Sequence, residues 1–209
     1  MAAAARGAEG YGDKMVRVLL VVDVQNDFCE GGSLAVAGGA AVAAAIASFV
    51  ASPAGTEYAH VVATQDHHIA PGSHFSAEPD FAGSWPPHCV AGTPGADFHP
   101  ALAASRFEEI FRKGEYAAAY SGFEGRSGGP AGVPLADWLS ARQVTAVDIA
   151  GIATDYCVRM TAADAVGLGL PVRVLIDLTA GVAAGTTAEA VRHMRSIGVE
   201  LVGQESVQR

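Results

Sequence analysis

Lysine is almost missing from this chain of 209 residues, which has only Lys14 and Lys113 beside eleven arginines. The formal net charge is −9, so nothing resembles the basic footprint that binds nucleic acid or an anionic membrane surface. No apolar run approaches the roughly 20 residues of a membrane-spanning helix. Because a lysine pKa can be shifted where an arginine's cannot, Lys113 is a candidate for chemistry that needs a lysine.

Cysteine is also scarce. The three cysteines, Cys29, Cys89 and Cys157, are odd in number and have no repeating spacing, so the sequence predicts no disulfide framework. This usage is typical of a reducing compartment, and we expect a cytoplasmic protein. Residues 1–14 are small and polar without an apolar signal-peptide core, and we expect a disordered tail. Residues 15–209 are then one domain, which is an ordinary length for an α/β fold.

The remainder of the chain alternates between strand and helix patterns. Continuous β-branched and aliphatic runs such as VRVLLVV at 16–22 are typical of strands buried on both faces. Alternating strands and helices predict an α/β, doubly wound (Rossmann-like) three-layer sandwich with a mostly parallel sheet. The expected strands are 16–22, 58–63, 107–112, 144–149, 172–176 and 199–202, and the expected helices are 40–50, 134–142, 155–166 and 187–196. Segment 127–132 is expected to be a flexible Gly/Pro insertion.

Chemically interesting residues follow several of these strands directly. Asp23, Asp66, Lys113 and the turn at 153–157 each come just after a predicted strand. In a doubly wound sheet the binding site lies beyond the carboxyl ends of the strands, so we expect the four to converge there. Taken singly, Asp23 also fits a turn-capping aspartate and Lys113 a solvated lysine.

The stretch from Asp66 to His88 holds four of the seven histidines in a long Pro- and Gly-rich loop. Imidazole and carboxylate ligands suit zinc, iron or manganese. A solvated polar loop is the alternative, but one aspartate and several histidines after a strand favour a site for one divalent metal ion. The candidate ligands are Asp66, His68, His74 and His88.

Cys157 lies at the start of a predicted helix. If Thr154 is the N-cap, Cys157 is the third helical residue, where free backbone N–H groups and the helix dipole lower a thiol pKa and can hold an oxyanion. A buried cysteine that packs as a small apolar side chain is the alternative, and position alone leaves both open.

An ordered set of motifs resembles the nicotinamidase/pyrazinamidase family of isochorismatase-like cysteine hydrolases. The resemblance runs from about residue 16 to residue 202, and only the ordered set is highly specific. The motifs are VVDVQNDF at 21–28, DHH at 66–68, SHF at 73–75, WPPHC at 85–89, KG at 113–114, YSGF at 120–123 and ATDYCV at 153–158.

The resemblance implies a six-stranded parallel sheet and a metal-dependent nicotinamidase. Such an enzyme hydrolyses nicotinamide to nicotinate and ammonia in NAD salvage through a thioester, and also deamidates pyrazinamide. The metal would hold the ring nitrogen, and a cis peptide would precede the oxyanion-hole residue, here at Ile152–Ala153. The implied residues are Asp23, Lys113 and Cys157 as catalytic triad, Asp66, His68, His74 and His88 as metal ligands, the backbone N–H groups of Ala153 and Cys157 as oxyanion hole, and Phe28, Trp85 and Tyr120 as pocket walls.

Two other functions stay open at this point. One is a related cysteine hydrolase acting on another small amide, although such relatives generally lack the Asp-His-His-His cluster. The other is a non-catalytic metal-binding protein of the same fold, which would have no need for Asp23, Lys113 and Cys157. We expect a small-molecule substrate, no nucleic-acid or membrane partner, and a monomer or small homo-oligomer. The sequence leaves open the metal and whether a metal-bound water takes part in hydrolysis.

Overall fold

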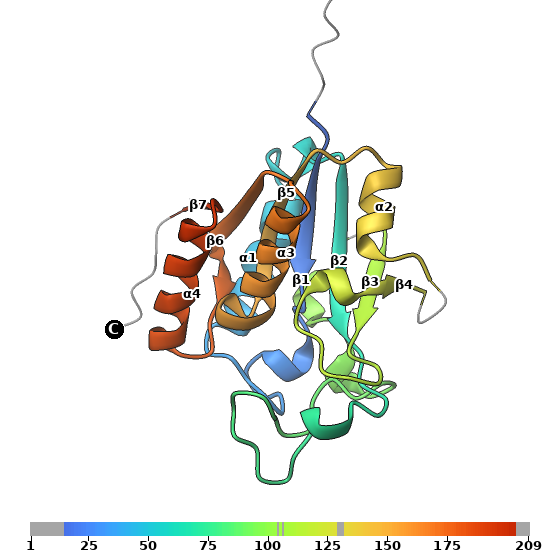
Figure 1. Cartoon of the computed structure of the whole chain (residues 1–209), viewed down its shortest axis with the longest axis vertical. Helices are drawn as coiled ribbons and strands as arrows, with labels where there is room; N and C mark the ends of the chain where they lie inside the picture. The colour runs from blue at the N-terminus through green and yellow to red at the C-terminus, as the bar shows by residue number, and fades with distance from the viewer. Residues whose placement is uncertain (1–14, 104, 106, 129–131, 204–209) are drawn as a thin grey trace, which may run out of the picture.

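A seven-stranded sheet with the order β4-β3-β2-β1-β5-β6-β7 forms the centre of the computed structural model (Figure 1). The structure describes residues 15–103, 105, 107–128 and 132–203, so the expected tail at 1–14 lies outside the described residues. The strands are β1 (Arg17–Val22), β2 (His60–Asp66), β3 (Ile110–Lys113), β4 (Arg126–Ser127), β5 (Ala146–Ile152), β6 (Val172–Ala180) and β7 (Glu200–Val202). The helices are α1 (Gly39–Val50), α2 (Leu135–Ala141), α3 (Arg159–Gly167) and α4 (Ala184–Ser196).

The expected parallel sheet is confirmed. Every neighbouring pair among β3, β2, β1, β5, β6 and β7 runs parallel, and these are the six strands expected from the sequence. The short strand β4 is an addition, because it pairs antiparallel with β3 at the sheet edge through Phe111 and Ser127. Segment 127–132 is therefore partly strand rather than wholly a flexible insertion, and its residues 129–131 lie outside the description.

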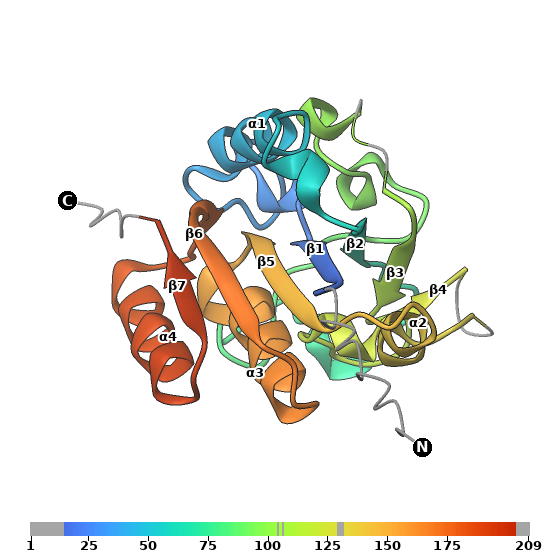
Figure 2. The same ribbon diagram turned by 90° about the horizontal axis from the view of Figure 1, so that it is seen from above.

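Helices cover both faces of the sheet, which makes three layers (Figure 2). Because side chains of a strand alternate between faces, β1 supplies both cores. Val18, Leu20 and Val22 belong to the core that contains residues of α2, α3 and α4. Leu19 and Val21 belong to the core that contains residues of α1. All five side chains are at most 1% exposed, which explains why this strand reads as a continuous apolar run.

The loop between β2 and β3 is irregular but well connected. It contains short 3₁₀ turns at Gly72–His74 and Pro94–Ala96, and isolated bridges join His68 to Val90 and Phe75 to Trp85. These bridges fold the loop back on itself at the carboxyl ends of the strands. Within the described residues, no helix has both the length and the apolar character needed to cross a membrane.

Candidate active site

Four neighbouring strands bring the expected catalytic residues to one edge of the sheet. Asp23 directly follows β1, Asp66 ends β2, Lys113 ends β3, and the turn containing Cys157 follows β5. Because β3, β2, β1 and β5 are adjacent and parallel, their carboxyl ends lie side by side. The convergence expected from the sequence is therefore present.

Asp23 is fully buried, and its chain leaves the sheet with a φ of +50°. The hydroxyl of Thr64, on β2, donates a 2.6 Å hydrogen bond to Asp23 Oδ1. The other oxygen, Oδ2, lies 2.9 Å from Lys113 Nζ. Burial raises the pKa of Asp23 above its ordinary value, and the Lys113 charge partly offsets this shift. Asp23 therefore sits in an environment that allows a carboxylate to accept a proton.

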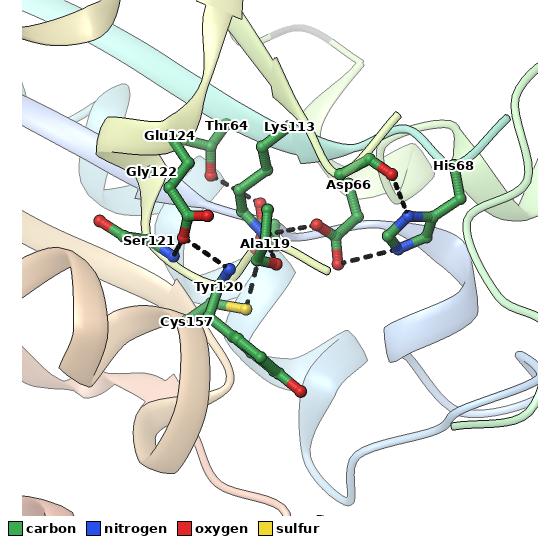
Figure 3. A network of polar contacts seen from close by, with 12 residues as sticks. Thr64, Asp66, His68, Lys113, Ala119, Tyr120, Ser121, Gly122, Glu124 and Cys157 are labelled. Carbon is green, nitrogen blue, oxygen red and sulfur yellow. Dashed lines mark hydrogen bonds and ion pairs between the residues drawn. The ribbon is translucent and has the colours of Figure 1, made fainter. Parts of the chain in front are cut away.

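Lys113 is 2% exposed and is the centre of the cluster (Figure 3). Its Nζ forms ion pairs with Asp23 Oδ2 and Asp66 Oδ1 and lies 3.7 Å from Cys157 Sγ. Burial by itself would lower the pKa of Lys113, but the two carboxylates and the neighbouring sulfur raise it well above its usual value. The ammonium therefore stays charged and can stabilise negative charge on either carboxylate or on the sulfur.

Cys157 lies in a π-helical turn, Thr154–Val158, that leads into α3. The expectation that Thr154 caps this helix is wrong: Ala153 is the N-cap residue, and no side chain caps the turn. The Ala153 carbonyl instead accepts hydrogen bonds from Tyr156 N and Val158 N at 3.1 and 3.0 Å. The helix begins one residue earlier than expected, and Cys157 is its fourth residue. The peptide bond Ile152–Ala153 is cis, as the resemblance implied.

The surroundings of Cys157 favour the protonated thiol. Burial raises its pKa well above the ordinary value; Lys113 lowers it, while Asp23 and Asp66 raise it further. Of the two interpretations that position alone left open, the raised pKa favours a thiol that is protonated before substrate binds, because loss of solvent outweighs the nearby positive charge. A protonated thiol of this kind needs a base within reach. Ligand atoms of Asp23, Asp66 and Cys157 all lie within 4.8 Å of one another.

The other cluster contains three buried histidines and Asp66. Ligand atoms of His68, His74 and His88 lie within 4.8 Å of one another. Asp66 Oδ2 lies 3.7 Å from His68 Nε2 and 4.0 Å from His88 Nε2. Asp66 thus faces Lys113 with one oxygen and the histidines with the other. His67 points elsewhere, with its Nδ1 3.4 Å from Glu115 Oε1.

Backbone carbonyls orient two of these rings. His68 Nδ1 lies 2.6 Å from Gly114 O, and His88 Nδ1 lies 2.7 Å from Pro86 O. Each ring can then donate from Nδ1 and keep Nε2 for a ligand, which is the usual arrangement of metal-binding histidines. Gly114 has a φ of +77°, and a Cβ there would lie 2.6 Å from the His68 ring, so a glycine is required beside Lys113.

The donor set fits a divalent metal ion. His68 Nε2 and His74 Nδ1 are buried without any hydrogen-bond partner, which is costly unless a ligand satisfies them. Burial and the neighbouring rings lower the pKa of His74 to about 4, and burial lowers that of His88. Both imidazoles are therefore neutral near pH 7, as metal ligands must be. Within the described residues, His68, His74 and His88 therefore form a group that could hold a metal ion.

A small cavity connects the two clusters. Asp66, His74 and His88 line one part of it and Cys157 another, and the aromatics expected from the resemblance, Phe28, Trp85 and Tyr120, line it as well. The sequence interpretation missed four further lining residues, Leu34, Val36, Tyr156 and Val182. Tyr156 lies in the motif ATDYCV at 153–158, and its position next to Cys157 was the one feature of the sequence that could have indicated its place in the cavity wall.

The chain matches a family model described as the isochorismatase domain over residues 17–206. The chain belongs to the isochorismatase family. The match extends from β1 to just beyond β7, so the sheet and both clusters lie within this isochorismatase domain.

Individual relatives of this isochorismatase-family chain carry the names nicotinamidase and pyrazinamidase. A Mycobacterium tuberculosis protein named nicotinamidase/pyrazinamidase is 62% identical over 187 residues, covering 90% of this chain and 98% of the relative. A Pyrococcus horikoshii pyrazinamidase structure in complex with zinc has a TM-score of 0.75 and 34% identity, covering 90% and 99% of the two chains. An L. infantum structure in complex with nicotinate has a TM-score of 0.77 and 35% identity, covering 90% and 92%.

Proposed function

We propose that this chain is a metal-dependent nicotinamidase that hydrolyses nicotinamide to nicotinate and ammonia, and that it also deamidates pyrazinamide. The observation that carries the proposal is the shared cavity, which three of the four candidate metal ligands and Cys157 line together. One small ring with a carboxamide could contact both. The names and complexes of the M. tuberculosis, L. infantum and P. horikoshii proteins support this substrate class.

In the proposed first half-reaction, Asp23 takes the proton of the Cys157 thiol and the thiolate attacks the carboxamide carbon. The C=O π bond opens as the S–C bond forms, and its electrons give a tetrahedral oxyanion, which backbone N–H groups of Ala153 and Cys157 would hold. Asp23 then gives its proton to the leaving nitrogen, and ammonia departs as the thioester forms. The raised pKa of Asp23 fits this exchange, because one carboxyl must both accept and return a proton.

In the second half-reaction, a water attacks the thioester carbon after giving a proton to Asp23. The C–S bond breaks, the sulfur leaves as thiolate and recovers the proton from Asp23, and the carboxylic acid product gives its own proton to ammonia or solvent and leaves as nicotinate. Lys113 stabilises the negative charge that moves between Asp23 and Cys157, since its ammonium lies 2.9 Å from one and 3.7 Å from the other.

Asp66, His68, His74 and His88 would hold one divalent ion, for which zinc, iron and manganese all suit the donor set. When bound, this ion supplies a Lewis-acid contact for the substrate's ring nitrogen. The side chains of Phe28, Trp85 and Tyr120 would wall the ring, and Trp85 Nε1 donates a 3.0 Å hydrogen bond to Tyr120 Oη that fixes their arrangement. Such positioning presents the carboxamide to the sulfur.

The proposal also includes a reducing, cytoplasmic location. Cys29, Cys89 and Cys157 are all free and buried, which fits a compartment that keeps thiols reduced.

The decisive experiment measures ammonia release from nicotinamide by the wild type, Cys157→Ala and the control Cys29→Ala. We expect the wild type and the control to be active and Cys157→Ala to lose about 10⁴-fold or more in kcat. Cys29 is a fair control because it is equally buried but belongs to the core under α1. A Cys157→Ala variant with wild-type turnover would refute the covalent mechanism. A wild type that releases ammonia only from other small amides would refute the assignment of nicotinamide as the substrate.

A further inference from the structure

The backbone of Asp66 lies where β2 loses its neighbour on one side. Toward β3, pairing continues to the end of the strand, and His67 N still donates to Lys113 O at 2.9 Å. Toward β1, the last backbone hydrogen bond runs from Asp23 N to Thr64 O at 3.3 Å, and the chain then turns away at Asp23. The N–H and C=O of Asp66 face this gap, where a buried peptide group without partners would be costly.

The side chain of Gln25 fills the gap. Gln25 Oε1 accepts from Asp66 N at 2.9 Å, and Gln25 Nε2 donates to Asp66 O at 2.8 Å. The same Nε2 donates to Ala96 O at 2.8 Å, and the residue is 0% exposed. A carboxamide offers a donor and an acceptor as a peptide group does, so Gln25 continues the ladder for one residue beyond the end of β1.

We propose that Gln25 is a positioning residue that orients Asp66 for its two partners. The inference rests on the metal site proposed above. With both backbone groups of Asp66 held, its carboxylate is fixed with one oxygen on Lys113 and the other 3.7 Å from His68 Nε2. Gln25 is not among the residues that line the cavity, and among the proposed metal ligands its side chain hydrogen-bonds Asp66, so its effect on metal binding would pass through Asp66. Partners of ligating side chains commonly change metal affinity by about 10–100-fold when they are removed.

The chemistry of the contact selects glutamine. A glutamate would place a second acceptor against the carbonyls of Asp66 and Ala96, which already need a donor. An asparagine is shorter by one methylene and cannot keep all three hydrogen bonds. A methionine has a similar length and flexibility but no polar atom that can replace the pair.

The test compares Gln25→Met with Gln65→Met. Gln65 is a matched control, since it is the same residue type, is 8% exposed and donates to the same Ala96 O at 3.2 Å, but makes no such contact with Asp66. The zinc dissociation constant of each metal-stripped protein is measured by competition with a chromophoric chelator, and folding is checked by circular dichroism. We expect about 10–100-fold weaker zinc binding for Gln25→Met and less than about threefold change for Gln65→Met.

A second variant, Gln25→Asn, keeps an amide and should lose less zinc affinity than Gln25→Met. It also decides the question if Gln25→Met does not fold. Folded Gln25 variants that bind zinc as tightly as the wild type, or a Gln65→Met protein that loses as much affinity, would overturn the proposal. A wild-type protein that binds zinc but does not hydrolyse nicotinamide would count against the proposed reaction and leave this inference standing. A wild type that binds no zinc would remove its basis.

Discussion

Two ion clusters in this molecule show how single residues tolerate burial of charge. At the carboxyl ends of the strands, one cation, Lys113, is shared by Asp23 and Asp66. Near the amino ends, one carboxylate, Asp148 on β5, is shared by Arg17 and Arg173. In each case several partners compensate the lost hydration of the central charge, which a single ion pair seldom does.

The Asp148 cluster gives stability a defined dependence on pH. Asp148 is 0% exposed and accepts from Arg17 Nη1 at 2.5 Å, Arg173 Nε at 2.8 Å and Tyr58 Oη at 2.5 Å. Burial raises the pKa of Asp148, but these hydrogen bonds and the arginine charges outweigh burial and hold it below its ordinary value. A carboxyl with a lowered folded-state pKa stabilises the protein above its unfolded-state pKa of about 4, and this contribution is lost as the pH falls.

We therefore expect Asp148→Asn to lower the free energy of unfolding at pH 7 by about 3 kcal/mol, because two guanidinium groups lose their shared partner. Between about pH 5 and pH 3, the wild type should lose stability more steeply than the variant. Chemical denaturation at several pH values measures both. Parallel curves for the two proteins over this range would contradict the assignment. An Asp164→Asn protein is a suitable comparison, as Asp164 is exposed on α3.

At the scale of elements, the apolar pattern located every parallel strand but misjudged the strand ends that carry the site. β2 was expected to end at residue 63 and extends to Asp66, and β3 was expected to end at 112 and extends to Lys113. An apolar run stops at the first polar residue, whereas Asp66 and Lys113 remain in the sheet because each neutralises the other. An apolar pattern therefore misses the strand residues that are held in the sheet by ion pairs and backbone pairing with a neighbouring strand and not by burial of an apolar side chain.

Contacts between distant segments account for the other features that the sequence did not reveal. Strand β4 has two polar residues and no apolar pattern, and only its pairing with β3 makes it a strand. Gln25 looks like any polar loop residue until β2 is placed beside it. The candidate ligands and triad could be named beforehand from motifs. That Asp66 contacts both Lys113 of the triad and His68 of the ligand set depends on the tertiary fold.

The turn at Thr154–Val158 and the loop around Phe81 meet through Tyr156. The Tyr156 ring packs edge-on against Trp85 at 5.1 Å and stacks on Tyr120 at 6.2 Å, and its hydroxyl lies 3.4 Å from Phe81 O. Most other hydrogen bonds of the Phe81 loop are internal, since Asp80 Oδ1 accepts from Ala82, Gly83 and Ser84 N. Tyr156 therefore helps hold this loop against the cavity.

We expect Tyr156→Ala to raise KM for nicotinamide by about 10-fold, because aromatic pairs contribute about 0.5–1.5 kcal/mol each beyond their buried area. The widened cavity should also accept nicotinamides with larger ring substituents. For nicotinamide itself, the fold decrease in kcat should be smaller than the fold increase in KM. Steady-state kinetics on a series of ring-substituted amides measures this. Tyr116→Ala is the control, since Tyr116 is 63% exposed. An unchanged KM and an unchanged substrate range in Tyr156→Ala would contradict the role.

For the whole molecule, the proposed metal site joins the sheet to its longest loop. Asp66 ends β2, whereas His74 and His88 lie in the segment that continues to β3. An ion held by these residues would bind the folded protein and not the unfolded chain, so it would stabilise the fold by about 2.7 kcal/mol at 100 times its dissociation constant. For a domain of this size, that corresponds to a rise in Tm of about 5–10 °C.

We expect zinc added to the metal-stripped wild type to raise Tm by this amount, and His74→Ala to show little response and little metal by elemental analysis. The control is His193→Ala, because His193 is exposed in the last turn of α4. Without metal, His74→Ala should differ little in stability from the stripped wild type, since relief of one buried ring nitrogen without a partner opposes the loss of ring packing on His68 and Tyr120. Full metal occupancy in His74→Ala would refute the ligand assignment, and an equal loss of zinc response in His193→Ala would show that the response does not come from this site.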